Sequence, residues 1–427
     1  MNDNIRFDAH CHIFTLKYIL KEVKSLLHDI INRTYPWEAP SKQSLQLTSE
    51  NRIAEIKDFL RQLYELLHSA FSSEEENLIF LQKEEKKEFP DDNLRIIPLM
   101  MDVFYMLAYS LDKDQDVTPM VGLKSGLVDE KEFQDSWDDV ISDFKVYLNN
   151  QKALVSSKKG YVAERKIKLA LEAIEEESSV REMFLSKKIR DIRGSNLNGF
   201  YRTDGFCYHM DELMALVKNR KDELYPFVAI DPRRPGIIKT LLNGDFFKGE
   251  QRFYGVKLYP RMGYHPQCKP MDDVYKYCSD NSIPITYHCG MSGFPPGTKW
   301  KHTEFGNPIN FEPIVKKYPN LRIDFAHMGS SSDLVWSRTV DRLVRENENV
   351  YTDFSCYTSL KDLNPMREFW DSNPKLKTRL MFGTDFDVMY LTDRVTMKEY
   401  YENFKHFFAD DELFSIMHDN PIRFLGL

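Results

Sequence analysis

Tyr254-Gly-Val-Lys-Leu258, Ile283-Pro-Ile-Thr-Tyr-His288 and Leu321-Arg-Ile-Asp-Phe-Ala-His327 are three short apolar runs that follow one another in the second half of the chain. Stretches of helical character, residues 271–279 and 311–317, separate them. Apolar runs of this length are typical of buried parallel strands, and strands that alternate with helices indicate consecutive β-α units. This part of the chain therefore predicts a parallel sheet of the α/β class.

Five further runs of the same character bring the predicted strands to eight. They cover residues 5–13, 94–103, 225–230, 350–354 and 379–383. Eight β-α units are the number that closes into a (β/α)8 barrel of the TIM type. A doubly wound open sheet is the alternative, and it is disfavoured because no glycine-rich phosphate turn follows any of the strands.

Two long helical stretches interrupt the barrel pattern, one after the first strand and one after the second. Residues 14–93 and 104–205 carry apolar side chains at three- and four-residue steps. We interpret both stretches as insertions and assign residues 1–13, 94–103 and 206–427 to the barrel. Loops that follow strands lie on the active-site side of a barrel, so the insertions are expected to cover its mouth as a lid or to mediate a homodimer.

The composition is that of an ordinary globular protein. Of the 427 residues 42% are hydrophobic, and 58 basic against 66 acidic side chains give a formal net charge of −8, which argues against a general nucleic-acid binder. We find neither an apolar run of transmembrane length nor an N-terminal signal segment. Six cysteines without a CxxC pair indicate reduced thiols. We therefore expect a cytoplasmic protein without membrane or nucleic-acid partners.

Metal-binding side chains lie where the predicted strands end. His10 and His12 end the first strand and share one face, because side chains alternate along a strand. Later strands end at Lys257, His288 and His327, and Asp385 follows the last one. The C-terminal ends of barrel strands converge on one mouth, so these residues are expected to meet.

A metal site is the interpretation that this convergence favours. A single histidine at a strand end is more often a core or rim residue, and one His-x-His pair is weak evidence for a metal site. The stronger evidence is that several strands end in metal-binding residues at the same side of the barrel. Three imidazoles and a carboxylate form a suitable nitrogen and oxygen set for Zn²⁺ or another divalent ion such as Mn²⁺.

Several motifs together resemble one known superfamily. The sequence contains Phe7-Asp-Ala-His-Cys-His12, Gly255-Val-Lys-Leu-Tyr-Pro260, Tyr287-His-Cys-Gly290, Asp324-Phe-Ala-His327, Phe382-Gly-Thr-Asp385 and Asn420-Pro-Ile-Arg-Phe-Leu-Gly-Leu427. These motifs resemble the amidohydrolase superfamily and, more narrowly, the amidohydrolase-related branch that includes aminocarboxymuconate-semialdehyde decarboxylase. The resemblance covers residues 5–13, 94–103 and 206–427, and the two helical stretches lie outside it.

The resemblance implies a role for each candidate. His10, His12 and His288 would hold the metal. Asp385 would be a ligand or near-ligand that also takes a proton from water. His327 would orient that water or stabilise negative charge on the substrate. One divalent ion per chain is favoured over two.

The same resemblance allows two interpretations of Lys257. Members with two metals often carry a carbamylated lysine at the end of the fourth strand, whereas in the one-metal branch a lysine there meets an anionic substrate. Tyr259 and Arg261, just beyond this strand, are further candidates for substrate binding, since a guanidinium suits a carboxylate. Arg233 and Arg234 are expected to lie in a solvated loop.

The leading hypothesis is a metal-dependent hydrolase in which activated water attacks an amide, lactone or ester carbon of a small molecule. A non-oxidative decarboxylase of a small carboxylic acid, a lyase at the same metal site, is the first alternative. A catalytically silent barrel that acts as a binding protein is the second, and the intact set of convergent polar residues disfavours it.

Overall fold

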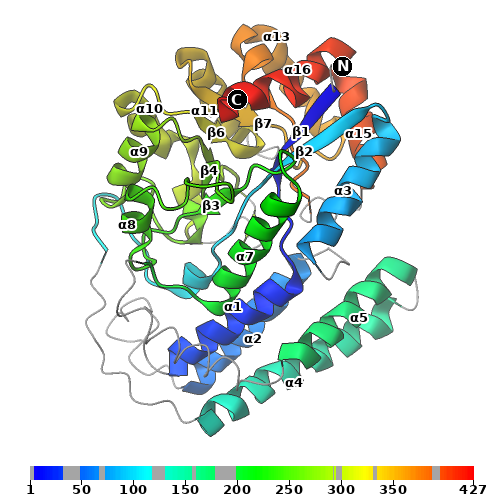
Figure 1. The fold of residues 1–427 in the computed structure, drawn as a ribbon, viewed down its shortest axis with the longest axis vertical. Coiled ribbons are helices and arrows are strands. Elements are labelled where there is room, and N and C mark those ends of the chain that lie inside the picture. The colour runs from blue at the N-terminus through cyan, green and yellow to red at the C-terminus, as the bar shows by residue number, and fades with distance from the viewer. Residues whose placement is uncertain are drawn as a thin grey trace.

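The computed structural model describes residues 4–31, 49–66, 73–117, 130–155, 160–177, 199–291, 293–294, 301–329, 334–386 and 395–427. All eight predicted strands are present (Figure 1). They are β1 (Asn4–Cys11), β2 (Asp92–Pro98), β3 (Phe227–Ala229), β4 (Gly255–Leu258), β5 (Ile285–Tyr287), β6 (Ile323–Phe325), β7 (Val350–Asp353) and β8 (Leu380–Met381).

The strands form a closed parallel barrel. Strands β3 to β8 pair side by side in chain order, and β1 pairs with β2. A parallel bridge between Leu99 and Phe227 joins β2 to β3, and the amide of Ala9 in β1 donates to the carbonyl of Phe382 just after β8 at 2.8 Å. These bonds complete the ring, so the chain has the predicted α/β fold of a TIM-type barrel, and the open-sheet alternative is wrong.

Helices surround the barrel on its outside (Figure 1). They are α3 (Glu74–Glu88), α7 (Asp204–Asn219), α8 (Ile237–Leu242), α9 (Met271–Asp280), α10 (Glu312–Lys317), α11 (Leu334–Glu346), α12 (Leu360–Leu363), α13 (Arg367–Ser372), α15 (Met397–Phe407), α16 (Asp410–Met417) and α17 (Asp419–Leu425). Their apolar faces share one large core with the strands. Phe424 of α17 closes the N-terminal end of the barrel, where its ring meets those of Phe227 and Tyr351.

Four further helices form a bundle on the side of the barrel towards which β1 runs (Figure 1). They are α1 (Leu16–Ile31), α2 (Ser49–Leu66), α4 (Glu130–Val155) and α5 (Gly160–Glu177), and they fall within the two predicted helical stretches. The bundle has its own apolar core, which includes Trp137. This core also contains Tyr259 and Met262, which follow β4, so the bundle packs on loops at the C-terminal ends of the strands.

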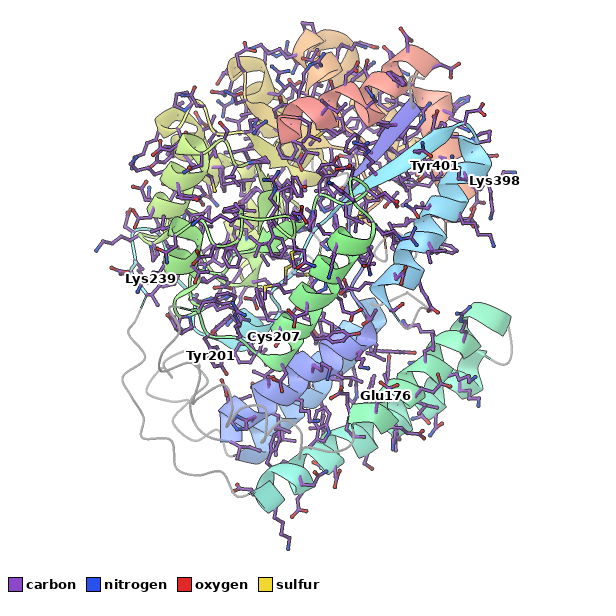
Figure 2. All side chains as sticks on the ribbon, viewed as in Figure 1. Glu176, Tyr201, Cys207, Lys239, Lys398 and Tyr401 are labelled. Carbon is purple, nitrogen blue, oxygen red and sulfur yellow. The ribbon has the colours of Figure 1, made fainter. Side chains whose placement is uncertain are left out.

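Polar contacts hold the bundle together and dock it on the barrel. Lys17 of α1 pairs with Glu176 of α5 at 2.7 Å, and Glu176 is labelled in Figure 2. The hydroxyl of Tyr201, also labelled, donates to Asp29 of α1 at 2.6 Å, and that of Tyr18 donates to the carbonyl of Met101 after β2. The division into barrel and insertions, and a lid or dimer role for the bundle, stay predictions. Within the described residues, no helix has both the length and the apolar character needed to cross a membrane.

Candidate metal centre

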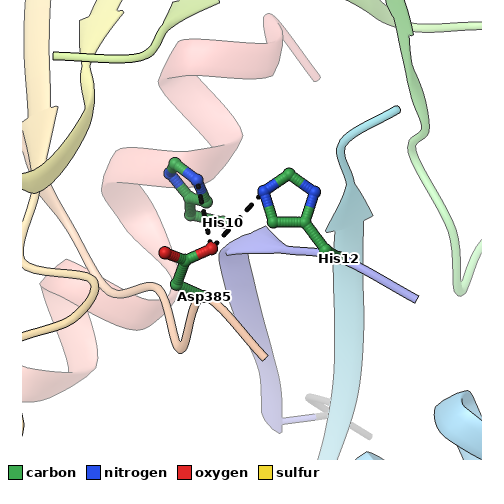
Figure 3. A group of neighbouring side chains, drawn as sticks. All are labelled: His10, His12 and Asp385. Atoms are coloured by element: carbon green, nitrogen blue, oxygen red, sulfur yellow. Dashed lines mark ion pairs between the residues drawn. The ribbon is translucent and has the colours of Figure 1, made fainter. Parts of the chain in front are cut away.

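His10, His12 and Asp385 meet at the C-terminal mouth of the barrel (Figure 3). The Oδ1 atom of Asp385 lies 3.4 Å from Nε2 of His12 and 3.7 Å from Nε2 of His10. The amide of Asp385 donates to the carbonyl of His10 at 2.7 Å, which ties the segment after β8 to β1. All three side chains are buried. The predicted convergence of the first and last strands is therefore present in the structure.

The Nδ1 atoms of His10 and His12 each have a hydrogen-bond acceptor. Nδ1 of His10 lies 2.8 Å from Oδ2 of Asp353, and Nδ1 of His12 lies 2.8 Å from the carbonyl of Leu99. Because a carbonyl and an ionised carboxylate only accept, both Nδ1 atoms carry a proton, and the Nε2 atoms are the ones left to face the centre. Both Nε2 atoms face Asp385.

This arrangement fits a divalent cation. Within the part of the chain that the structure describes, Oδ1 of Asp385 has no hydrogen-bond partner. One ligand atom each of His10, His12 and Asp385 lies within 4.8 Å of the other two. Two imidazoles with a carboxylate suit zinc and related ions.

Asp353, at the end of β7, holds two of the histidines and was missed by the sequence reasoning. Its Oδ2 atom accepts from His10, and its Oδ1 atom accepts from the backbone amides of His327 at 3.0 Å and Ser355 at 2.9 Å. Burial alone would raise the pKa of this carboxyl, but His10 and the other donors hold it well below its ordinary value. An aspartate at the end of a predicted barrel strand was the available signal.

His327 and His288 form a second pair beside this group. Nε2 of His327 lies 3.3 Å from Nδ1 of His288, and the ring of His288 stacks on Tyr259 with centroids 3.9 Å apart. The hydroxyl of Ser355 donates to Asp353, so it accepts from Nδ1 of His327 at 2.8 Å. His288 lies outside the three-residue groups whose ligand atoms are close enough to share an ion. Its predicted role as a ligand stays a prediction.

Burial keeps several of these imidazoles neutral. It lowers the pKa of His12 to about 3 and that of His327 to about 4, and it lowers the pKa of His288 well below its ordinary value. Neutral imidazole is the form that donates a lone pair to a metal. Burial alone would raise the pKa of Asp385, but the neighbouring histidines lower it, so this carboxylate is ionised.

Lys257 lies beside the same centre. Its Nζ atom is 3.4 Å from Nε2 of His10, and burial lowers the pKa of the amine to about 8. The side chain also borders a cavity at the mouth between β2, β3 and β4. That cavity is lined by Met100, Asp102, Ala229, Ile230, Asp231, Lys257, Tyr259, Met262 and Tyr264. Lys257 thus lies between the metal centre and a small cavity with room for about one water molecule, while its carbamylation stays untested.

The two other substrate-binding candidates differ in position. Tyr259 borders the cavity, and its hydroxyl accepts from the amide of Phe294 at 2.7 Å. Arg261 is not among the residues that line this cavity. Its buried guanidinium donates instead to the carbonyl of Met291 at 3.0 Å and to the hydroxyl of Thr303, which fixes the segment after β5.

The expectation that Arg233 and Arg234 are solvated is wrong. Both side chains are buried, and each forms a two-pronged ion pair. Arg233 pairs with Asp231 at 2.6 Å and 2.9 Å, and Arg234 pairs with Asp102 at 2.7 Å through two nitrogens. The fork of the guanidinium matches the carboxylate, and this pairing compensates the loss of water.

The backbone around the centre is held in unusual conformations. His327, Cys356 and Asp385 have φ angles of 61°, 64° and 48°, in the left-handed region that side chains other than glycine rarely adopt. Close packing, and not an unusual φ angle, requires a glycine at position 383. A Cβ atom there would lie 2.6 Å from Cβ of His10. Close approach and strain around a cluster of polar side chains are typical of functional sites.

A protein-family model described as Amidohydrolase matches residues 199–427. Comparison with curated protein sequences gives no significant match.

Several solved structures are similar in fold. A TIM-barrel protein from Bordetella bronchiseptica is 17% identical, with 74% of this chain and 98% of that chain covered and a TM-score of 0.42. A probable 2-pyrone-4,6-dicarboxylic acid hydrolase from Acinetobacter baumannii, with citric acid bound, is 13% identical, with coverages of 57% and 88% and a TM-score of 0.40.

A third structure is that of 5-carboxyvanillate decarboxylase from Novosphingobium aromaticivorans, complexed with manganese and a nitrobenzoic acid. It is 13% identical, with 52% of this chain and 69% of that chain covered and a TM-score of 0.40. Similarities at this level do not indicate a reaction. The family model, in contrast, matches more than half of the chain, and the chain therefore belongs to the amidohydrolase family.

Proposed function

We propose that this protein is a metal-dependent hydrolase of a small molecule, in which activated water attacks an amide, lactone or ester carbon. The observation that supports this most is the convergence of Nε2 of His10 and Nε2 of His12 on Oδ1 of Asp385. Membership of the amidohydrolase family supports an enzyme.

His10, His12 and Asp385 would hold one divalent ion, with Zn²⁺ or Mn²⁺ proposed, and His288 is the further predicted ligand. Such an ion supplies a Lewis acid and makes hydroxide available near neutral pH. Asp353 and the carbonyl of Leu99 keep the two ligand imidazoles in the tautomer that binds a metal.

Asp385 is proposed to take the proton from the attacking water and to return it to the leaving group. Its carboxylate is ionised and faces the centre, which suits a general base. His327 is neutral, and Ser355 holds its Nδ1 proton, so its Nε2 lone pair is suited to orienting the water. Tyr259 and Lys257 border the cavity and would contact the substrate.

Decarboxylation of a small carboxylic acid at the same centre is a second candidate, and Lys257 favours it. An amine with a pKa of about 8 is largely protonated at neutral pH, and it borders both the cavity and His10. A substrate carboxylate placed there would meet a positive charge in a site with little water. A homodimer and a cytoplasmic location remain proposals from the sequence.

One experiment separates these reactions. Protein loaded with zinc or with manganese is incubated with small lactones, amides and esters, and in parallel with aromatic carboxylic acids while carbon dioxide release is measured. Asp385→Asn protein serves as the matched inactive variant, and Asp371→Asn, in an exposed position, serves as the active control. Hydrolysis that is lost in metal-free protein and in Asp385→Asn protein supports the proposal. Carbon dioxide release supports the second candidate. Turnover that persists both without metal and in Asp385→Asn protein contradicts both candidates.

A further inference from the structure

The backbone at residue 293, after β5, lies directly against the imidazole of His288. A Cβ atom at Gly293 would lie 2.7 Å from Nε2 of His288 and 2.5 Å from the hydroxyl of Tyr259. The φ angle of Gly293 is 136°, which side chains other than glycine rarely adopt. Only a glycine permits this close approach, so the backbone at this position covers the imidazole.

Two residues that follow β4 tie this part of the chain down. The hydroxyl of Tyr259 accepts from the amide of Phe294 at 2.7 Å, and the guanidinium of Arg261 donates to the carbonyl of Met291 at 3.0 Å. The ring of Tyr259 also stacks on that of His288, with centroids 3.9 Å apart. The imidazole is therefore enclosed by the tyrosine ring and by the backbone that this tyrosine anchors.

The side chain of Phe294 connects this anchored backbone with the helical bundle. Its ring centroid lies 6.3 Å from that of Phe59 on α2, and both side chains are buried. Phe294 and Tyr259 belong to the apolar core of the bundle. Helix α2 lies outside residues 199–427, which the family model matches. The contact over His288 thus comes from a part of the chain that the family model does not cover.

We propose that Phe59 is a positioning residue for His288. By packing on Phe294, the bundle holds the backbone at residue 293 against the imidazole and keeps Tyr259 stacked on it. Loss of one such aromatic pair should make local opening at this point about 2–10-fold more frequent. The proposal concerns where the imidazole is held. It does not depend on whether His288 binds a metal or on which reaction the centre catalyses.

Deuterium exchange at Cε1 of histidine, measured by mass spectrometry, reports how readily water reaches each imidazole. Full-length metal-free protein is compared as wild type, Phe59→Ala, Phe294→Ala and the double variant. His288 is buried, so it should exchange slowly in the wild type and about 2–10-fold faster in each single variant. The double variant should exchange little faster than the single ones, because both changes remove the same contact.

Phe144→Ala is the matched control. Phe144 is buried in the same core of the bundle, but its ring packs against Tyr64 and Tyr147. This variant should leave the exchange of His288 as it is in the wild type. An increase in Phe144→Ala protein as large as in Phe59→Ala protein would show general loosening of the bundle and would overturn the proposal.

The loop variant keeps the test decisive even if Phe59→Ala protein does not fold. Equal exchange of His288 in wild-type and Phe294→Ala proteins overturns the proposal, because Phe294 is the link through which Phe59 acts. If exchange follows the prediction but no metal-dependent turnover is found, the positioning role of Phe59 stands and only the proposed function fails.

Discussion

Oδ2 of Asp353 lies 2.8 Å from Nδ1 of His10, while Oδ1 of the same carboxylate accepts from the backbone amide of His327 at 3.0 Å. One side chain at the end of β7 thus positions histidines that arrive from β1 and β6. Asp353 points its oxygens at these donors and at the amide of Ser355. The centre is held in shape by a carboxylate that is not itself among the proposed ligands.

Replacing Asp353 should weaken metal binding without removing a ligand. In Asp353→Asn protein, the amide carries less negative charge and no longer fixes the tautomer of His10, so the affinity for zinc should fall by about 10–100-fold. Competition with a chromogenic chelator measures this change. Asp371→Asn, at an exposed position, is the control and should bind zinc as the wild type does. Equal affinity of the Asp353→Asn and wild-type proteins would show that this carboxylate does not orient His10.

Asp385→Asn should separate binding from chemistry. The amide oxygen can still contact an ion, but the side chain no longer accepts a proton from water, so turnover should fall by about 10²–10⁴-fold while metal largely remains. Rates with the substrate found by screening, normalised to bound metal, measure the effect. Unchanged turnover per bound ion would refute the proposed role of Asp385 as the base.

The buried pair of Arg234 and Asp102 should contribute to stability only as a pair. Arg234→Leu leaves Asp102 charged and buried without its partner, so the free energy of unfolding should fall by about 3–5 kcal/mol. The double change Asp102→Leu with Arg234→Leu should cost less than the single one, because no buried charge is left alone. Denaturant unfolding measures both.

The partly exposed pair of Arg342 and Glu312 offers a control for this prediction. Arg342→Leu should lower the free energy of unfolding by only about 0–1 kcal/mol, because water screens the pair. If Arg234→Leu lowers the free energy of unfolding no more than Arg342→Leu does, the buried Asp102 carboxylate does not need Arg234 as its partner.

Glu85 should make the protein less stable as the pH rises. Burial raises the pKa of this carboxyl on α3 from 4.5 to about 7. Between these values the folded chain binds a proton that the unfolded chain has released, so the free energy of unfolding falls as pH increases through this window, by on the order of 3 kcal/mol at most. Glu85→Gln removes this titratable carboxyl. The free energy of unfolding of the variant should therefore decline less between pH 5 and pH 8 than that of the wild type.

The measurement is chemical denaturation at several pH values. Glu75→Gln, an exposed position on the same helix, should keep the pH dependence of the wild type. If the Glu85→Gln protein shows the same decline as the wild type, another group causes the pH dependence.

The sequence predicts the fold well because a barrel repeats one simple signal. Each buried parallel strand appears in the sequence as an apolar run. All strands of a parallel barrel run in the same direction, so the residues at their C-terminal ends lie together at the mouth. His10, His12 and Asp385 could therefore be brought together in advance, although more than 370 residues separate His12 from Asp385.

The rest of the site depends on side-chain directions that no pattern in one sequence specifies. Asp353 and Cys356 lie at and just after β7, a strand that was predicted, but their contacts arise from the turn that follows it. Arg234 resembles a surface cation in the sequence and is buried only because Asp102, 132 residues earlier, meets it in space. Pairing across long sequence distances is visible only once the barrel has closed.

The metal content of the protein tests the central claim most directly. Wild-type and His10→Ala/His12→Ala proteins are purified without chelators, incubated with zinc or manganese, freed of excess ion and analysed by plasma mass spectrometry. The account predicts at least about one tightly held ion per wild-type chain and loss of that ion from the double variant. A wild-type protein that retains neither ion, or a double variant that retains as much as the wild type, would contradict it.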